Sequence, residues 1–483
     1  MMLVIDVGTT GLRAAVMRPD GSLKTVEYRA NNPVSPFPGL VEFDATLMAE
    51  LALDAAIAVL DRAGNPSIGA VGIASQRAST VVWERASGRP IGPAIGWQDL
   101  RTIGECLTLK AEHGLSLAPN QSATKLVWLL ANAAAGRDPS ELCFGTVDSW
   151  IAWTLSQGAI HVTDHTNAAV TGLYSIEAAG WNTGVCELLG IDPVMLPTIV
   201  NSSGVVGHAA ALPGAPTIAA LAGDQQASLA GQGCTRPGMA KITFGTGGML
   251  DLCTGRERPA AADRSPNGTF PIVAWTIGGT ETWAVEAIML SAGTNVEWLR
   301  DDMGLIESAA ESHDVASGCT SSDGVVYVPA LLGLGTPRWD FGARGTLLGV
   351  TRGTERSHVV RAVLEGIAHR GADMVEAAQA DTGHDIPTLR IDGGMSRNPT
   401  FVQALANASG KPVEVSPVIE ATTIGAGFLA GVATGRWSNL DEAATAWTPH
   451  SVIEPTDSLD REMWARAIER TICWIPELSA LDF

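Results

Sequence analysis

The sequence predicts an α/β fold in which two domains of related construction face each other across a cleft. Two observations predict it. A buried strand that ends in a glycine turn occurs three times, at residues 3–11, 241–248 and 389–394. Helical patterns alternate with strand patterns in both halves of the chain. Such mixed hairpin and strand–helix signals are typical of a sheet of mixed direction covered by helices.

The chain length supports two domains. At 483 residues the chain is too long for one compact hydrophobic core. Residues that break helices and strands are concentrated between Gly231 and Gly238, and the order of strand, glycine turn and helix begins again after them. We therefore expect an N-terminal domain over residues 1–231 and a C-terminal domain over residues 235–483.

The first half begins with strands and a hairpin. Strands are predicted at Met2–Asp6, Gly11–Met17, Ala70–Ser75 and Thr80–Trp83. The run Arg18–Gly21 predicts a hairpin turn, because proline presets its own backbone angle and glycine tolerates a positive one. Asp44 is expected to cap an amphipathic helix that ends at Arg62. The apolar stretch Leu126–Ala135 predicts a short buried helix.

The second half restarts with the apolar run Met239–Phe244, which predicts a strand. Helices are then predicted at Glu281–Asp301, Glu355–Thr382, Asn398–Ala408 and Thr422–Thr434. The segment after Asn439 carries tryptophans and charges at helical spacing. We expect this segment to pack back on the domain as a helix.

Composition excludes several classes of partner. A net charge of −20 argues against nucleic acid and anionic membranes. No apolar span reaches the roughly 18 residues of a membrane helix, and no signal-peptide pattern opens the chain. The seven cysteines form no CxxC pair and the nine histidines form no HExxH motif, so we expect reduced thiols and no structural metal. These observations predict a cytoplasmic protein.

The first glycine turn, Asp6 to Arg13, has the composition of a phosphate-binding loop. Its glycines let backbone N–H groups approach an anion, Thr9 and Thr10 add hydroxyl donors, and Arg13 adds positive charge. The Asp6 carboxylate can hold Mg²⁺ through water. The alternative is an ordinary hairpin after an edge strand.

Two later turns repeat this design. Gly245–Gly248 follows an apolar run and could clasp a second phosphate, or it could be a glycine hairpin. The run Ile391–Asn398 opens a helix, where glycine lets a base or ribose lie close to the backbone and Asn398 can bond it. A tight strand–helix turn is an equal alternative for this second run.

Asp224 is the candidate general base. It follows an apolar run and a glycine near the domain boundary, and a carboxylate there can accept the proton of a hydroxyl that attacks a phosphate. Its composition alone favours a helix N-cap. Arg77 could bond substrate hydroxyls or lie on the surface, and Trp97 could form an apolar wall for a polyol or pack in the core.

Two nucleotide-dependent classes are excluded by their missing motifs. The chain has no GxxxxGK(S/T), so a P-loop fold is not expected. It has no HRD and DFG set, so it is not a protein kinase.

The ordered motifs together resemble the FGGY carbohydrate kinases, and most of all the glycerol kinase branch. The similarity covers nearly the whole chain. Its strongest blocks are Ile5–Arg13, Ser75–Thr102, Phe144–Trp153, His161–Ala168, Ala222–Cys234, Pro329–Gly353, Asp392–Asn398 and Glu420–Gly431. The resemblance implies two actin-like (RNase-H-type) domains that close on ATP and a polyol or sugar. It also implies a possible homodimer.

The resemblance also implies a role for individual residues. Asp224 would be the catalytic base and Asp6 would organise Mg²⁺. The phosphates of ATP would contact Thr10, Gly11, Arg13 and Thr246. The ribose and adenine would lie along Gly293, Gly394 and Asn398, with Glu297 near the adenine. The substrate pocket would be lined by Arg77, Trp97, Asp224 and Gln225.

Three departures from the glycerol kinase pattern concern the substrate pocket. Ala78 stands where that branch has glutamate, Asn120 where it has tyrosine, and Met249 where it has phenylalanine. A buried polar substrate group left without a partner costs about 1–3 kcal/mol, so glycerol should bind poorly unless water fills the space. We expect a longer polyol, such as a tetritol or pentitol, or a ketose. Glu297 stands where the branch has glutamine. The glycine-rich regulatory loop of the family is absent from this chain between Gly204 and Thr217, so that regulation is not implied.

Three alternatives to this interpretation remain open. The first is a glycerol kinase proper. The second is a non-catalytic ATP-binding switch, which would need only the three glycine turns. The third is a sugar sensor with a decayed active site, against which the intact Asp6, Thr10 and Asp224 count.

Overall fold

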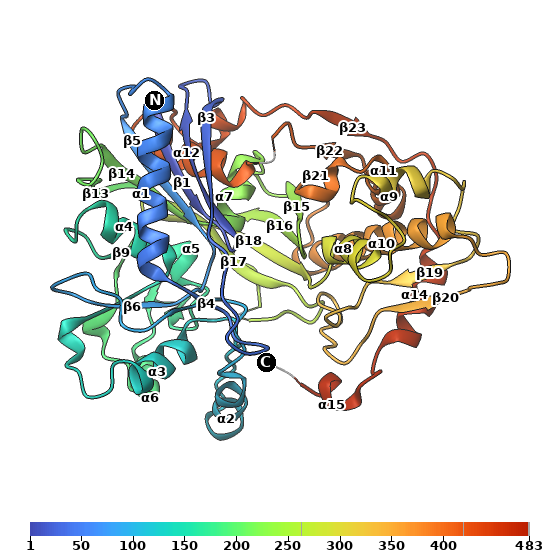
Figure 1. The fold of residues 1–483 in the computed structure, drawn as a ribbon, viewed down its shortest axis with the longest axis horizontal. Coiled ribbons are helices and arrows are strands. Elements are labelled where there is room, and N and C mark those ends of the chain that lie inside the picture. The colour runs from blue at the N-terminus through green and yellow to red at the C-terminus, as the bar shows by residue number, and fades with distance from the viewer. Residues whose placement is uncertain (262, 419, 482–483) are drawn as a thin grey trace.

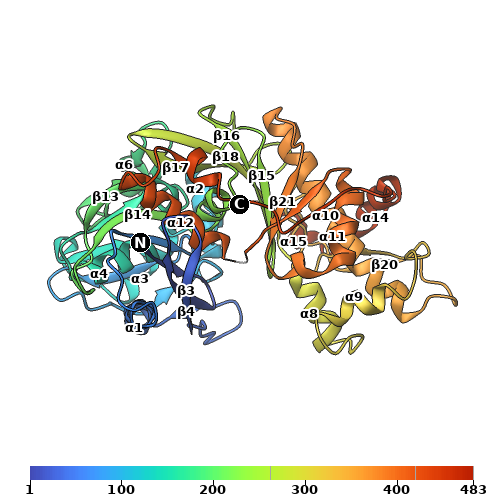
Figure 2. The same cartoon turned by 90° about the horizontal axis from the view of Figure 1, so that it is seen from above.

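The computed structural model describes residues 1–483 except 262, 419, 482 and 483. It confirms an α/β fold: a 13-stranded sheet of mixed direction runs through the molecule, with helices on its faces (Figure 1). The strand order is β23-β22-β21-β15-β16-β18-β17-β13-β14-β5-β1-β2-β3. The N-terminal part of the chain lies on one side and residues from about 290 to 410 lie on the other (Figures 1 and 2).

The N-terminal half of the sheet is built on β1 (Met2–Val7). It pairs antiparallel with β2 (Gly11–Met17) and parallel with β5 (Ala70–Ser75). The outer strands are β3 (Leu23–Ala30), β14 (Thr217–Gly223) and β13 (Ser203–His208). Helix α1 (Ala45–Arg62) covers β2 and β3, and the Asp44 side chain caps it as predicted.

The second half repeats this arrangement around β15 (Ala240–Phe244). It pairs antiparallel with β16 (Gly248–Gly255) and parallel with β21 (Leu389–Asp392), as β1 does with β2 and β5. The other strands are β17 (Phe270–Ile277), β18 (Thr280–Met289), β22 (Val413–Val415) and β23 (Ser451–Ile453). A bridge between Ser203 and Ile277 joins the two halves into one sheet. The predicted boundary between residues 231 and 235 stays a prediction.

Helix α12 (Ala421–Ala433) crosses back to the N-terminal half and packs on β1, β5 and β14, beside α7 (Asp224–Gly231). The two helices touch backbone to backbone. A Cβ at Gly425 would clash with the carbonyl of Ala227, and a Cβ at Gly231 would clash with that of Ala421. Glycine at these two positions therefore allows the close packing of α7 on α12, and Asp224 is the first residue of α7.

The remaining helices cover the second half and the outside of the first. Helix α10 (Arg356–Thr382) packs against α11 (Pro399–Ser409), with α8 (Gly293–Asp301) and α9 (Glu311–Ala316) beside them. The other elements are β4 (Glu42–Phe43), β6 (Val81–Glu84), β7 (Ala94–Ile95), α2 (Ile103–His113), α3 (Ala123–Asn132), β8 (Leu142–Gly145), α4 (Val147–Leu155), β9 (Val162–Asp164), α5 (His165–Ala168), β10 (Tyr174–Ser175), β11 (Gly180–Trp181), α6 (Thr183–Leu189), β12 (Thr198–Val200), β19 (Val326–Val328), β20 (Thr346–Leu348), α13 (Leu440–Ala444), α14 (Arg461–Thr471) and α15 (Pro476–Ser479).

The predicted helix at Glu281–Asp301 is wrong in its first part. Residues 280–289 form strand β18, and the helix begins only at Gly293. Alternate residues of β18, such as Val285 and Ala287, are buried on one face, a period of two that charged neighbours obscured. The segment after Asn439 also differs from the single helix expected, because it contains strand β23 between two helices.

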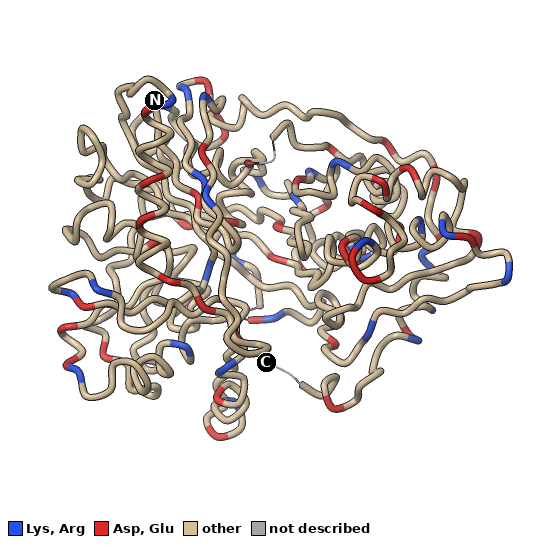
Figure 3. Tube along the Cα trace, viewed as in Figure 1, with Lys and Arg blue, Asp and Glu red and all other residues tan. Residues whose placement is uncertain are grey.

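Within the described ranges, no helix is both long enough and apolar enough to span a bilayer. Acidic and basic residues are interspersed along the trace of both halves (Figure 3). Five of the cysteines are buried, and none of the described ones forms a disulfide.

Candidate active site

The sheet of the second half has one apolar face and one polar face. Ile242, Leu250 and Val285 point into the core under α10. Their neighbours alternate to the opposite face, toward α7. That face carries the side chains of Lys241, Thr243, Met249, Asp251 and Glu286.

Three of these charged residues form one row across adjacent strands. Lys241 on β15 is paired in register with Asp251 on β16, which is paired with Glu286 on β18. Lys241 Nζ lies 2.8 Å from Asp251 Oδ2, and both side chains are fully buried. Lys241 Nζ also donates to Gln225 Oε1 at 2.6 Å and to Thr243 Oγ1 at 3.1 Å. The row therefore connects the sheet of the second half to helix α7.

Arg77 reaches this row from the N-terminal half, just after β5. Its Nη2 donates to Glu286 Oε2 at 2.6 Å, and its Nε lies 3.6 Å from Asp224 Oδ1. Its Nη1 is buried and has no hydrogen-bond partner among the described residues. One donor of the guanidinium is therefore left for a further acceptor at this point.

Asp224 is the first residue of α7, whose N-cap is Gly223, so it is not the helix cap that composition favoured. Its Oδ1 accepts a hydrogen bond from the backbone N–H of Gln225 at 2.8 Å. About a quarter of the side chain, 27%, is exposed. Burial raises the pKa of Asp224, while the positive charges of Arg77 and Lys241 oppose that rise. A carboxylate in this setting can accept a proton from an alcohol.

Asp6 lies at the end of β1 and is 5% exposed. Its Oδ2 accepts a hydrogen bond from Thr423 Oγ1, at the start of α12. The pKa of Asp6 is raised to about 6, mainly by burial; the charge of Arg13 opposes the rise and the negative charge of Asp224 contributes to it. Asp6, Arg13 and Asp224 thus belong to one electrostatic neighbourhood.

The first glycine turn connects this neighbourhood to Trp97. Trp97 Nε1 donates to Thr9 Oγ1 at 3.1 Å, and Trp97 is half-buried rather than part of the core. Thr10 is exposed, and Gly11 is buried against Tyr28, whose ring also lies under the Arg13 guanidinium.

The other two glycine turns lie close to neighbouring backbone. Gly293, at the start of α8, donates its N–H to the carbonyl of Gly245, and a Cβ there would clash with that carbonyl. Gly393 has φ +86°, and a Cβ there would clash with the carbonyl of Phe244. The turn after β15 therefore lies between the start of α8 and the turn after β21. The close approach of backbone explains why Gly293 and Gly393 are glycines. Thr246, in the turn after β15, is exposed.

The remaining predicted nucleotide residues surround these turns. Gly394 and Glu297 are exposed. Asn398 caps α11, accepting from the N–H of Phe401, and its amide donates to Ser312 Oγ at 2.9 Å. The Asn398 side chain is thus already occupied by two structural contacts.

The three residues of the enlarged pocket have different settings. Ala78 is buried with φ +61°, and its carbonyl accepts from Ser122 Oγ at 3.0 Å. Asn120 is exposed, and its carbonyl accepts from Lys125 Nζ. Met249 is half-buried on the same strand face as Asp251. Ala78 is therefore directly linked to the segment that contains Asn120.

Sequence reasoning missed Lys241, Asp251 and Glu286. Glu286 pairs with Arg77, and Lys241 bonds both Gln225 and Asp251. Their signal was a single charge inside an otherwise apolar strand run, as in Ala240–Phe244. A buried charge is stable only when it is paired, so such a position predicts a partner.

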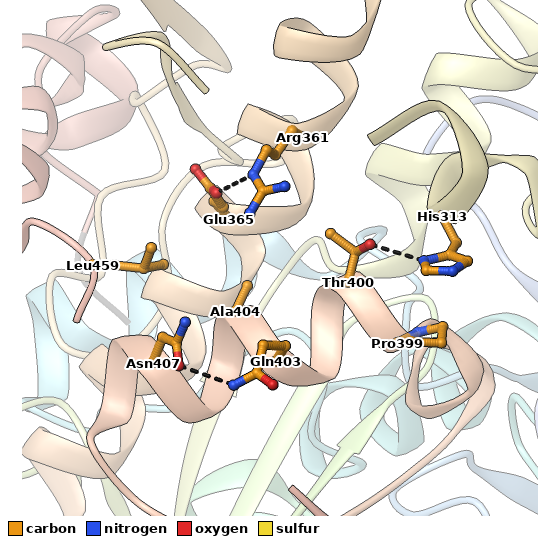
Figure 4. A pocket seen from close by; sticks show the side chains of 9 residues that line it. All are labelled: His313, Arg361, Glu365, Pro399, Thr400, Gln403, Ala404, Asn407 and Leu459. Atoms are coloured by element: carbon orange, nitrogen blue, oxygen red, sulfur yellow. Dashed lines mark hydrogen bonds and ion pairs between the residues drawn. The ribbon is translucent and has the colours of Figure 1, made fainter. Parts of the chain in front are cut away.

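An open cavity of about 250 Å³ lies elsewhere, between α9, α10 and α11 (Figure 4). Its polar side chains largely bond one another: Arg361 with Glu365, His313 with Thr400, and Gln403 with Asn407. None of the predicted site residues lines it. The cavity is therefore not the candidate active site.

Comparison with known proteins assigns both halves of the chain to one family. Residues 1–231 match the N-terminal domain of the FGGY family of carbohydrate kinases, and residues 240–434 match its C-terminal domain. Glycerol kinases from Trichlorobacter lovleyi and Aromatoleum aromaticum are 42% and 41% identical, covering 98% of this chain and 99% of each relative.

Solved structures give the same fold. The Plasmodium falciparum glycerol kinase with ADP superposes with a TM-score of 0.90 at 28% identity, covering 98% of each chain. A xylulose kinase from Brucella ovis superposes with a TM-score of 0.84 at 24% identity over the full length of both chains.

Proposed function

Since the chain belongs to the FGGY family of carbohydrate kinases, we propose that it transfers the γ-phosphate of ATP to a terminal hydroxyl of a small, uncharged polyol or sugar. One observation carries this proposal. Arg77 from the first half lies beside Asp224 and is held by Glu286 of the second half, and Lys241 of the second half bonds Gln225, the residue after Asp224 at the start of α7. A candidate base, Asp224, and two groups that can donate hydrogen bonds to a substrate oxygen, Arg77 and Gln225, thus lie side by side.

The residues present fit a magnesium–nucleotide complex. The pKa of Asp6 is raised to about 6, so its charge is incompletely compensated by the protein, and a cation would supply the missing compensation. Asp392 Oδ1 is buried with no hydrogen-bond partner among the described residues. Mg²⁺ is commonly held by one or two carboxylates together with phosphates and water, so the Asp6 carboxylate and the phosphates of ATP would be enough to hold it. When bound, Mg²⁺ neutralises phosphate charge.

The reaction requires Asp224 to accept one proton. The acceptor hydroxyl oxygen forms a bond to the γ-phosphorus while the bond to the β-phosphate oxygen breaks, and ADP leaves. The hydroxyl proton passes to the Asp224 carboxylate. Arg77 Nη1 and the Gln225 amide donate to acceptor oxygens and orient the attack. Closure of the two halves would exclude water that otherwise hydrolyses ATP.

The charges at the site favour an uncharged acceptor. Among the described residues, the ion pairs at this point join three carboxylates, Asp224, Asp251 and Glu286, to two cations, Arg77 and Lys241. When all five are ionised, one excess negative charge remains. A carboxylate or phosphate on the acceptor would add to it, so acidic sugars are disfavoured.

The size of the acceptor follows from Ala78, Asn120 and Met249. The first two are smaller than the residues of the glycerol kinase branch, and methionine is more adaptable than phenylalanine. We infer a tetritol, a pentitol or a ketose as the preferred acceptor. A glycerol kinase proper is the second candidate, because the curated relatives at about 40% identity are glycerol kinases.

A coupled assay of ADP release with uncharged C3 to C6 polyols and ketoses, and with gluconate as the anionic control, tests the proposal. We expect acceptor-dependent ADP release that is highest for a C4 or C5 compound and weakest for gluconate. A highest specificity constant for glycerol would contradict the enlarged pocket. Acceptor binding without ADP release from any compound would instead support a sugar sensor.

A further inference from the structure

Lys241 has more hydrogen-bonding partners than its buried charge requires. Its ammonium group is fully buried on the polar face of β15 and has three partners, Asp251, Gln225 and Thr243. A Lys–Asp pair alone would balance the buried charge. The contact at 2.6 Å to Gln225, on another element, goes beyond that need.

This contact fixes which end of the Gln225 amide faces the sheet. A lysine ammonium group only donates hydrogen bonds, so it must face the amide oxygen and not the amide nitrogen. The Gln225 NH₂ group therefore points away from Lys241. Among the described residues, no group accepts a hydrogen bond from that NH₂, and the side chain is half-buried rather than enclosed.

The free NH₂ group lies one residue from the base. Asp224 precedes Gln225 at the start of α7, and the Gln225 backbone N–H already bonds the Asp224 carboxylate. Arg77 Nη1, also without a partner, belongs to a guanidinium 3.6 Å from the same carboxylate. Two unsatisfied donors thus border the group that would take the acceptor proton.

We propose that Lys241 is a positioning residue for the phosphoryl acceptor: it locks the Gln225 amide so that its NH₂ donates to an acceptor hydroxyl oxygen. The inference rests on the proposed function and deepens it. It assigns acceptor affinity, rather than nucleotide affinity, to a buried lysine that does not itself touch the acceptor.

A purely structural role for Lys241 makes a different prediction. Removing Lys241 alone would leave the Asp251 carboxylate buried without a counter-charge and could unfold the protein. Replacing both partners by apolar residues of similar volume avoids that cost. The double variant K241M/D251L therefore removes the Gln225 contact and keeps the strand pair packed. The variant Asp251→Asn is the matched control, because it keeps the contact between Lys241 and Gln225. It leaves the buried Lys241 ammonium without its counter-charge, so circular dichroism must first show that this variant is folded.

The test is calorimetric titration of the full chain with glycerol, erythritol and xylitol without nucleotide, and separately with ADP. We expect K241M/D251L to bind the preferred polyol at least about tenfold more weakly, and Asp251→Asn to stay within about threefold of the unsubstituted protein. Gln225→Glu keeps an oxygen toward Lys241 but loses the NH₂, so it should weaken polyol binding as the double variant does. ADP affinity should stay within about threefold in all variants.

Unchanged polyol affinity in K241M/D251L, or an equal loss in Asp251→Asn, would overturn the proposal. Gln225→Glu lies on a half-buried helix position and tests the NH₂ contact even if the double variant fails to fold; unchanged affinity in it would also overturn the proposal. Combining Gln225→Glu with K241M/D251L should cause no further loss, since both act on one contact. Failure of the proposed function is separate: it would appear as an unsubstituted protein that releases no ADP with any acceptor.

Discussion

Arg77 and Glu286 form an ion pair of 2.6 Å although 209 residues separate them along the chain. The pair joins the loop after β5 to strand β18 and leaves 13% and 7% of the two side chains exposed. Because each charge is desolvated, removing one partner leaves the other uncompensated. The pair fixes the guanidinium at the point where the two halves of the sheet meet Asp224.

Replacement of Arg77 by lysine, which keeps a positive charge beside Glu286 but loses the guanidinium donors, should therefore impair acceptor binding more than nucleotide binding. We expect the KM for the acceptor to rise by at least about tenfold and the KM for ATP to change by less than about threefold, since Arg77 contacts the base and not the glycine turns. Steady-state kinetics with each substrate varied would measure both values. Glu286→Gln is the control, because its amide oxygen still accepts from Arg77. A rise confined to the KM for ATP would contradict this assignment.

Asp6→Asn should remove most of the effect of magnesium on nucleotide binding. The amide is nearly the same size but lacks the charge that attracts the cation. In calorimetry, the unsubstituted protein should bind ADP more tightly with Mg²⁺ than with a chelator, and the variant should bind ADP about equally in both conditions. An unchanged magnesium effect would place the metal elsewhere. The magnesium effect in Asp392→Asn, at a second buried carboxylate, shows by comparison whether the loss is specific to Asp6.

The double variant A78E/N120Y should shift preference toward glycerol. Ala78 already carries a Cβ at φ +61°, so glutamate adds little backbone strain, and Asn120 is exposed. The two larger side chains would reduce the space inferred for a longer acceptor. The ratio of kcat/KM for glycerol to that for xylitol should rise by at least about tenfold. A ratio that falls or stays constant would show that these positions do not set acceptor size.

His161 should make the protein sensitive to acid. Burial lowers the pKa of His161 to about 4, and one of its ring nitrogens bonds the Phe144 carbonyl at 2.8 Å. Between its unfolded pKa of about 6.5 and pH 4, the unfolded chain binds more protons than the folded chain, so the free energy of unfolding falls as pH falls. At pH 5 the loss is about 2 kcal/mol. Urea titrations should give a flatter pH dependence for His161→Gln; equal slopes would contradict the assignment.

Much of the fold could be predicted because its signals are local. Strands β1 and β2 are continuous buried runs with a Pro-Asp-Gly turn before β3, and α1 has a clear apolar period with a capping aspartate. Strand β18 could not be separated from α8 in this way. Its charged residues, such as Glu281 and Glu286, suit the surface of a helix until the partner strands are known.

Some residues of the candidate site also have local sequence signals, and others do not. Asp6 lies near the end of β1, and Arg77 and Asp224 follow β5 and β14, so the local pattern marks all three. A single charge in an apolar strand run indicates that Lys241 needs a partner. The identity of its partners, and the contact of Glu286 with Arg77, follow only from segments that are far apart in sequence.

The central claim is that Asp224 accepts the proton of the attacking hydroxyl. Acceptor-dependent ADP release by Asp224→Asn, with ADP affinity measured in parallel, tests it most directly. We predict a loss of kcat of about 10²–10⁴-fold with ADP affinity nearly unchanged. A variant that retains kcat within about tenfold of the unsubstituted protein would contradict the account.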